Sequence, residues 1–221
     1  MLQPMLRALV LGLCLAAGPA GACETALVLS IDVSGSIDKG DYRLQAEGLA
    51  AALTDPAVAD ALVEGQVALA VVHWSGVDQQ ALVLPWQRML TQGAVRRFAE
   101  AAARAPRAFE GSDTAVGQGL RFALAQFPEV ADCDRLVVDI SGDGQENAGF
   151  TDASARFEAR AMGVAVNAIA IEEPGPASPI TRYYLSWVVT PGGFVVTARG
   201  LQDYAASLRL KLLRELSKPV G

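Results

Sequence analysis

The stretch LVLSIDVSGSID, residues 27–38, decides how the rest of the chain is interpreted. It begins as an apolar run typical of a buried strand and ends in Asp32, Ser34 and Ser36, three polar residues spaced two apart. In an extended loop this spacing points the three side chains to one side, and Gly35 lets the backbone turn tightly between the serines. Because open parallel sheets bind ligands beyond the carboxyl ends of their strands, the stretch predicts a polar site at the end of the first strand.

Apolar strand-like runs alternate with helical patterns along the whole chain. Strands are expected near residues 26–32, 66–73, 81–84, 135–141, 164–171 and 194–198. Helices are expected near residues 40–53, 92–104, 114–127, 152–162, 180–188 and 201–216. This alternation predicts an α/β fold, with a doubly wound, mostly parallel six-stranded sheet and helices on both faces.

One segment, from Val67 to Leu84, departs from that alternation. Only the turn-rich residues 75–80 separate its two apolar runs, which is too short a stretch for a helical crossover. It therefore predicts an antiparallel strand at the edge of the sheet, and Pro85 is expected to end that strand.

The start of the chain is typical of a secretory signal peptide. Residues 1–22 contain Arg7, an apolar run at residues 8–17, a break at Pro19 and small residues before Cys23. A membrane anchor is the alternative, but the apolar run is too short to cross ~30 Å of hydrocarbon. The remaining residues, 23–221, have the length and apolar content of one domain, so we expect a single exported domain in the periplasm or outside the cell, without membrane insertion.

The overall charge argues against some partners. The 221 residues carry a formal net charge of −6, and loss of the signal peptide with Arg7 makes the mature chain one unit more negative. An acidic surface is not suited to binding nucleic-acid phosphates or anionic lipid. It does not exclude an acidic ligand that is held through a metal ion.

The cysteines agree with export. Cys14 leaves with the signal peptide, and the two that remain, Cys23 and Cys133, each lie just before an apolar strand. Parallel neighbouring strands would place these two sulfurs side by side, so we predict a disulfide in an oxidising compartment. The alternative is that Cys23 is the lipidated first residue of a lipoprotein, but Ala20-Gly21-Ala22 lacks the leucine that such a signal usually carries.

Two further polar segments accompany the opening stretch. Asp143 lies between Gly142 and Gly144 after the fourth strand, and Thr114 is expected to open a helix after a glycine-containing loop. Together with Asp32, Ser34 and Ser36 these residues supply only hard oxygen ligands, which suit Mg²⁺ or Mn²⁺, and also Ca²⁺, better than zinc or copper. Taken singly, each has a simpler interpretation: the serines as a turn, and Thr114 or Asp113 as a helix N-cap.

Taken jointly, the three segments resemble the metal-ion-dependent adhesion site of von Willebrand factor type A domains. The resemblance covers roughly residues 24–217, and within that superfamily the chain is similar to a bacterial group of small exported proteins whose function is unassigned. It implies that Ser34, Ser36 and Thr114 contact the metal through hydroxyls, while Asp32 and Asp143 hold its waters. A cation met by neutral hydroxyls keeps much of its charge and can take a carboxylate from a partner protein. The implied function is metal-dependent protein binding.

Two other functions remain open. A metal-dependent hydrolase of the haloacid-dehalogenase kind needs a second acid two residues after the first, where Ser34 stands. No Gly-x-Ser-x-Gly elbow or phosphate loop is present, and His73 is the only histidine, so we predict that the protein is not an enzyme. A purely structural module, in which the protein itself closes the last metal position, cannot be separated from the adhesion-type module by sequence.

Four other polar residues have two interpretations each. Asp139 has the same strand parity as Asp143 and competes for its role, and its place in a buried strand has no explanation in the sequence. His73 either lines the rim of the site or packs inside. Glu172 and Glu173 either shape ligand choice or belong to a solvated loop.

Overall fold

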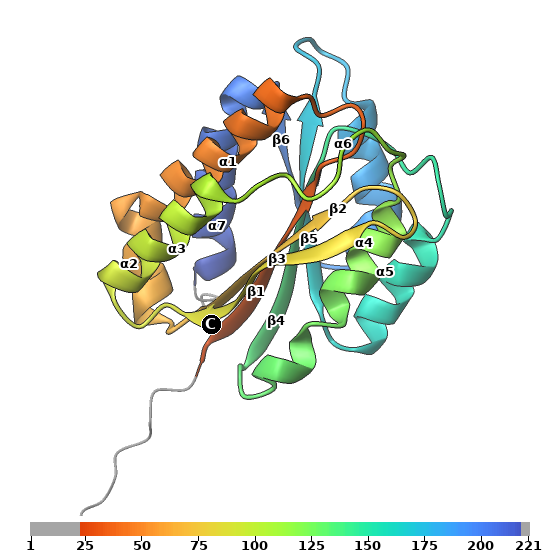
Figure 1. Ribbon diagram of the computed structural model, residues 1–221. Coiled ribbons are helices and arrows are strands. Elements are labelled where there is room, and N and C mark those ends of the chain that lie inside the picture. The colour runs from red at the N-terminus through yellow and green to blue at the C-terminus, as the bar shows by residue number, and fades with distance from the viewer. Residues whose placement is uncertain (1–22, 218–221) are drawn as a thin grey trace, which may run out of the picture.

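The sheet has six strands in the order β3-β2-β1-β4-β5-β6 (Figure 1). The computed structural model describes residues 23–217, so the expected signal peptide at residues 1–22 lies outside the described residues. The strands are β1 (Thr25–Asp32), β2 (Ala68–Trp74), β3 (Gln80–Arg88), β4 (Arg135–Gly142), β5 (Ala165–Glu172) and β6 (Val195–Arg199). Only the β2–β3 pair is antiparallel among these strands, so the predicted mixed sheet with one antiparallel edge strand is confirmed.

The strand order reverses at β1. The chain adds β2 and β3 on one side of β1 and then crosses over to add β4, β5 and β6 on the other. β1 and β4 are parallel neighbours, with Ile31 opposite Ser141. Asp32 therefore ends β1 beside the point where Asp143 follows β4. Ligands of open α/β sheets bind at such a reversal, so the topology brings two of the predicted polar segments to the expected edge.

Helices cover both faces of the sheet (Figure 1). One face packs against α1 (Lys39–Thr54), α2 (Pro56–Glu64), α3 (Gln92–Arg104) and α7 (Tyr204–Leu216), the last preceded by the short η3 (Leu201–Asp203). The other face packs against α4 (Val116–Leu124), η1 (Phe127–Val130), α5 (Asp152–Ala161), α6 (Pro179–Tyr183) and the π-turn η2 (Tyr184–Val188). The strands β1 and β2 are buried along their whole length, as expected for strands covered on both faces.

The local structure differs from the prediction in two places. Helix α2 was not predicted, although Asp55 caps its N-terminus by accepting hydrogen bonds from two backbone amides and Pro56 occupies its first turn. Pro85 does not end β3, which continues to Arg88. The pairing of β3 with β2 shifts register between Leu69 and Val72, at the level of Pro85, and an edge strand with such an irregularity tolerates a residue that has no N–H to donate.

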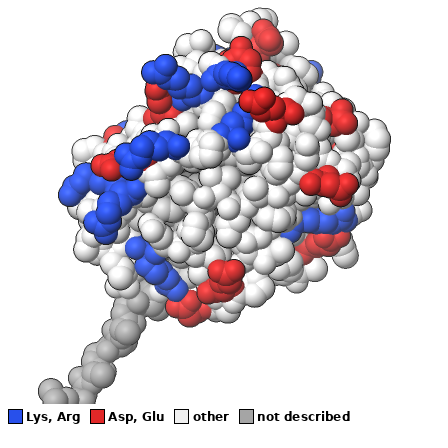
Figure 2. Space-filling view, viewed as in Figure 1, with Lys and Arg blue, Asp and Glu red and all other residues white. Residues whose placement is uncertain are grey.

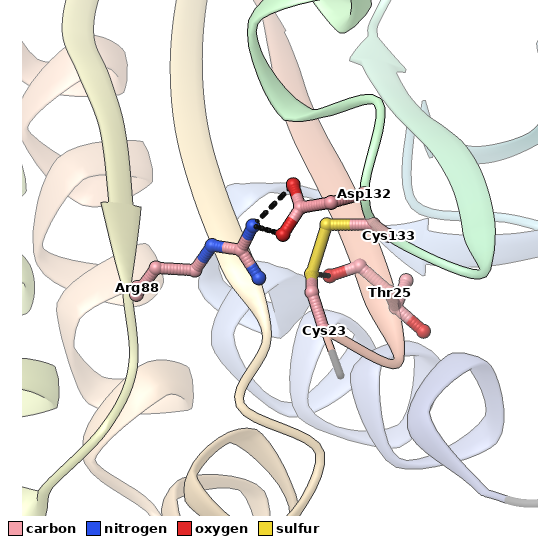
Figure 3. The surroundings of a disulfide bond; sticks show 5 residues. All are labelled: Cys23, Thr25, Arg88, Asp132 and Cys133. Carbon is pink, nitrogen blue, oxygen red and sulfur yellow. Dashed lines mark hydrogen bonds and ion pairs between the residues drawn. A yellow bond between two sulfur atoms is a disulfide. The ribbon is translucent and has the colours of Figure 1, made fainter. Parts of the chain in front are cut away.

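The predicted disulfide is confirmed. Cys23 and Cys133 are joined across a sequence separation of 110 residues (Figure 3). The bond lies at the amino ends of β1 and β4, where Asp134 also donates a backbone hydrogen bond to Cys23. An ion pair between Arg88 and Asp132, 2.6 Å between Nη2 and Oδ2, lies beside it (Figure 3). This covalent link is thus at the edge of the sheet opposite to Asp32.

The surface carries both signs of charge. Figure 2 shows basic side chains gathered over α1 and α3 on the left of the view and acidic side chains on the right. On this face the two signs of charge are therefore unevenly spread. Within residues 23–217, no helix has the length and apolar character needed to cross a membrane.

Candidate metal centre

Three loops bring the five predicted site residues together. Ser34 and Ser36 come from the loop after β1, Thr114 from the loop before α4 and Asp143 from the loop after β4. The Thr114 hydroxyl donates to Ser34 Oγ at 3.2 Å, the two serine hydroxyls are 3.3 Å apart, and Ser36 donates to Asp143 Oδ1 at 2.7 Å. Asp32 Oδ1 accepts from the backbone N–H of Ser34 at 2.7 Å. The result is one continuous cluster of hydroxyl and carboxylate oxygens.

The cluster is buried at one end and open at the other. Asp32 and Ser34 are 0% exposed and Thr114 is 6% exposed. Ser36 is exposed, and Asp143 is partly buried. A molecule approaching from solvent would therefore meet Ser36 and Asp143 first, with Asp32 beneath them.

Gly35 is required by a close approach of two loops rather than by a tight turn. Its φ angle lies outside the positive range found at several other glycines. Its N–H donates to the carbonyl of Ser112 at 2.7 Å, and a Cβ atom on Gly35 would lie 3.0 Å from that same carbonyl oxygen. The glycine therefore allows the loop that carries Thr114 to reach the serines.

Thr114 is held in place by residues that the sequence did not single out. Its N–H donates to Asn147 Oδ1 at 2.8 Å, and its carbonyl accepts from the Asn147 N–H at 2.9 Å. Helix α4 begins at Val116, so the prediction that Thr114 opens the helix was wrong. Neither Thr114 nor Asp113 caps this helix, since a Glu146 carboxylate oxygen takes the hydrogen bond from the Gly117 N–H instead. The hydroxyl of Thr114 is thereby free to face Ser34.

Arg107 supports the serine loop from below. Its Nη2 donates to the carbonyls of Val33 and Ser34, at 2.9 and 2.8 Å. The residue lies 74 positions away from Val33, so no local sequence pattern points to this contact. The guanidinium donates its hydrogen bonds to backbone oxygens and, as the smallest of several causes, lowers the pKa of Asp32.

Burial dominates the electrostatics of the two carboxylates. It raises the pKa of Asp32 from 3.8 to about 7, with the neighbouring Asp143 as the second cause and hydrogen bonds from Ser34 opposing it. Burial also raises the pKa of Asp143, against the hydrogen bond from Ser36. Ionised forms of both groups are therefore unfavourable unless positive charge is supplied nearby.

The residues present fit a hard divalent cation. Among the described residues, Asp32 Oδ2 is buried without a hydrogen-bond partner. The other atoms of the cluster that could face a metal ion are hydroxyl and carboxylate oxygens. Mg²⁺ and Mn²⁺ prefer such oxygens. Among residues 23–217 no group of three or more His, Cys, Asp and Glu side chains is placed to hold a metal, so any site here depends on the hydroxyls.

Comparison with protein families identifies the chain at the level of a family. A family model described as "Protein of unknown function (DUF1194)" matches residues 22–220. The chain belongs to this DUF1194 family. A comparison with curated proteins finds no match for the chain.

Solved structures confirm the von Willebrand A fold of this DUF1194 protein. It is similar to the pilus adhesin SpaC of Lactobacillus rhamnosus GG, with 15% identity and a TM-score of 0.64 over 87% of this chain and 30% of that one. It is also similar to proximal thread matrix protein 1 of the mussel byssus with a zinc-occupied MIDAS motif, with 19% identity, a TM-score of 0.62, and 88% and 46% of the two chains covered. A third is the von Willebrand domain of the pili tip protein Mfa5 of Porphyromonas gingivalis, at 9% identity and TM-score 0.60, covering 90% and 98%. The DUF1194 chain thus spans less than half of SpaC and of the byssus protein.

The four remaining polar residues of the DUF1194 protein lie outside the cluster. Asp139 is explained by Lys211 of α7, whose Nζ lies 2.7 Å from Asp139 Oδ1, so it does not compete with Asp143. His73 is 3% exposed and packs edge-on against Tyr42, and burial lowers its pKa to about 4. Glu172 accepts a hydrogen bond from the Thr181 N–H at the start of α6. Glu173 is exposed and raises the pKa of Asp143 as one of its lesser causes.

Proposed function

We propose that this DUF1194 protein is an exported, non-enzymatic module that binds a partner protein through a divalent cation, Mg²⁺ first, with Mn²⁺ or Ca²⁺ as alternatives. The hydroxyls of Ser34, Ser36 and Thr114 contact the cation, and Asp32 and Asp143 hold its waters. A carboxylate of the partner completes the coordination. The observation that carries the proposal is the single hydrogen-bonded cluster formed by these five residues, from the end of β1 and three separate loops.

The chemistry of the cluster supports capture of an anionic group. Neutral hydroxyls leave the cation with most of its charge, and carboxylates outside the first coordination sphere orient the waters without neutralising the ion. Ser36 and Asp143 lie on the solvent side of the cluster. A carboxylate from another protein therefore has a path to the cation that needs no opening of the fold.

The comparisons support the proposal only by analogy. The byssus protein is described with zinc in its MIDAS motif, SpaC is described as a pilus adhesin, and Mfa5 as a pili tip protein. Their TM-scores establish a shared fold. Their identities to this chain are below 25%, so the similarity extends no further than the fold. Transfer of metal binding and adhesion to this chain is part of the proposal. Export is supported in addition by the disulfide, because such bonds persist in oxidising compartments.

Calorimetric titration of the chelator-stripped mature protein with Mg²⁺ tests the metal site. We expect saturable binding by the wild type and none by Asp32→Ala. The matched control is Asp113→Asn, because Asp113 is an exposed carboxylate next to Thr114 that takes no part in the cluster. The control should bind Mg²⁺ as the wild type does. Equal binding by the wild type and Asp32→Ala, or none by the wild type, contradicts the proposal.

A second experiment separates partner capture from structural bracing. Paramagnetic Mn²⁺ in the site should speed the relaxation of the carboxyl carbon of ¹³C-acetate, a minimal mimic of a partner carboxylate. We expect enhancement with the wild type that disappears with Asp32→Ala. Saturable Mn²⁺ binding without any enhancement would mean that the protein itself closes the last metal position, as in the bracing alternative.

A further inference from the structure

Two buried polar atoms beneath the candidate metal centre have no hydrogen-bond partner among residues 23–217. They are the hydroxyl of Tyr184 and Oδ2 of Asp32, and both residues are 0% exposed. Buried tyrosine hydroxyls usually find a partner, because an unpaired buried polar group is unfavourable. Asp32 Oδ1 already accepts from the Ser34 N–H, so Oδ2 is the oxygen that remains available.

The two atoms face the same point, above Gly142. A Cβ atom on Gly142 would lie 2.5 Å from the Tyr184 hydroxyl and 2.9 Å from Asp32 Oδ2. Gly142 is the last residue of β4, directly before Asp143. Any side chain here would separate the donor from the acceptor. The absence of one leaves a gap that a small side-chain rotation or one bridging water molecule can close.

An unusual backbone segment presents the tyrosine. Tyr184 begins the π-turn η2, in which the Val189 N–H donates to the Tyr184 carbonyl at 3.0 Å. π-turns are rare and occur frequently at functional sites. The preceding residue, Tyr183, points elsewhere, since its hydroxyl donates to Asp152 Oδ2 at 2.7 Å. The two adjacent tyrosine hydroxyls thus lie in different surroundings, that of Tyr183 on Asp152 and that of Tyr184 above Gly142.

The tyrosine stays a hydrogen-bond donor at physiological pH. Burial, followed by the carboxylate of Asp32, raises the pKa of Tyr184 well above its usual value. That influence of Asp32 also indicates that the two side chains are close. Trp74 offers another buried and unpartnered N–H, but its ring packs on α4, where a Cβ on Gly119 would lie 2.5 Å from Trp74 Cγ.

We propose that Tyr184 is a positioning residue of the metal centre. Its hydroxyl donates to Asp32 Oδ2, directly or through one water, and so fixes the orientation of the carboxylate that holds the waters of the cation. This inference rests on the proposed function. Hydrogen-bond partners of this kind tune metal sites, and their loss typically weakens metal binding by roughly 10- to 100-fold.

Tyr184→Phe removes the hydroxyl alone and is the first test. By calorimetry, we expect its dissociation constant for Mg²⁺ to rise about tenfold. Without metal, its thermal unfolding midpoint should fall only slightly, because the variant loses one hydrogen bond and keeps its buried ring. The matched control, Tyr183→Phe, loses the bond to Asp152, so it should unfold at a lower temperature and keep wild-type Mg²⁺ affinity. Affinity of Tyr184→Phe within twofold of a wild type that binds Mg²⁺ overturns the inference.

A second measurement works without metal and separates failure of this inference from failure of the proposed function. The ζ-carbon NMR resonance of Tyr184 is assigned by its disappearance in Tyr184→Phe. In chelator, Asp32→Asn should shift this resonance because an amide replaces the carboxyl group that faces the hydroxyl, and Asp113→Asn should leave it in place. No shift in Asp32→Asn overturns the Tyr184–Asp32 contact. If the shift occurs but the wild type binds no Mg²⁺, the contact stands and the role in a metal centre is wrong.

Discussion

Two regions of the molecule bury carboxylates, and they balance the charge in opposite ways. Beneath the loops at the carboxyl edge of the sheet, Asp32 is 0% exposed, and inside the sheet Asp139 is 3% exposed. Burial is the largest cause that raises the pKa of each to about 7. Asp139 faces Lys211, whose Nζ lies 2.7 Å from Asp139 and 2.5 Å from Glu215 of the same helix. Asp32 accepts hydrogen bonds only from Ser34 among the described residues, its backbone N–H at 2.7 Å and its side chain.

The difference distinguishes the interior cluster, which has a structural role, from the edge cluster, which is the candidate metal centre. The interior cluster brings its own cation, and Lys211 is 0% exposed. Beside the cluster at the edge, the Arg107 guanidinium lowers the pKa of Asp32 but donates its hydrogen bonds to backbone carbonyls. A buried carboxylate by itself is therefore no sign of metal binding in this fold. The informative feature is that Arg107 does not offset the burial of Asp32, whose pKa stays raised, while the cluster opens to solvent.

Removing the disulfide should have the largest effect on stability and none on the edge cluster. Cys23→Ser combined with Cys133→Ser opens a loop whose ends are 110 residues apart. On the chain-entropy model this lowers the free energy of unfolding by about 4 to 5 kcal/mol, as measured by urea denaturation. Mg²⁺ affinity should be unchanged, because the bond lies at the opposite edge of the sheet. An unchanged free energy of unfolding without reductant would contradict the role given to the disulfide.

Lys211→Met should destabilise the protein by about 3 to 5 kcal/mol, since it leaves Asp139 and Glu215 buried without their cation. The matched control is Arg209→Met on the same helix. Arg209 pairs with Asp55 nearer the surface, at 40% side-chain exposure, so its loss should change stability by about 1 kcal/mol or less. Urea denaturation of both variants measures the contrast. Similar losses in the two variants would mean that the interior cluster is not closed by Lys211.

The pH dependence of stability should divide between the two regions. A carboxyl whose pKa is raised from 3.8 to about 7 stabilises the fold fully below pH 3.8, and this contribution is lost as the pH rises through 7. In chelator, Asp139→Asn and Asp32→Asn should therefore each lose less stability than the wild type between pH 4 and 7. Denaturation across that range, repeated with Mg²⁺, checks the division. Saturating Mg²⁺ should cancel the part of the stability loss that is due to Asp32 and leave the part that is due to Asp139. Cancellation of the Asp139 part instead would contradict the comparison.

Gly35→Ala should have the smallest effect on stability and a clear effect on the site. The added Cβ meets the Ser112 carbonyl oxygen at 3.0 Å, so the loop that carries Thr114 must shift. We expect a loss of about 1 kcal/mol in the free energy of unfolding together with weaker Mg²⁺ binding by calorimetry. The control is Gly93→Ala in α3, where the nearest atom is a flexible arginine end at 3.4 Å. That variant should keep its Mg²⁺ affinity, and a parallel loss there would mean that Gly35 has no special role.

Much of the fold could be predicted from the sequence because its signals are local. Continuous apolar runs predicted the buried strands, and the short turn-rich connection predicted the antiparallel edge. The Asp32-x-Ser34-x-Ser36 pattern and the strand-end position of Asp143 predicted which side chains meet. Helix α2 was missed although Asp55 and Pro56 carried its start signal.

The rest of the site depends on contacts between segments far apart in the chain. Arg107 supports a loop 74 residues away, and Asn147 holds Thr114 from 33 residues away. The Tyr184 hydroxyl and Asp32 Oδ2 face the same point above Gly142, which has no side chain. Likewise the buried Asp139 made no sense until Lys211 was placed opposite it. No periodicity in the sequence encodes such pairings.

The central claim is that the edge cluster needs a cation from outside and the interior cluster does not. Thermal and urea unfolding of the wild type, Asp139→Asn and Asp32→Asn, each in chelator and in Mg²⁺, tests it most directly. At a Mg²⁺ concentration about 100 times the dissociation constant, the wild type and Asp139→Asn should each gain about 2.7 kcal/mol, and Asp32→Asn should gain nothing. An equal gain in Asp32→Asn, or no gain in the wild type, would contradict the account.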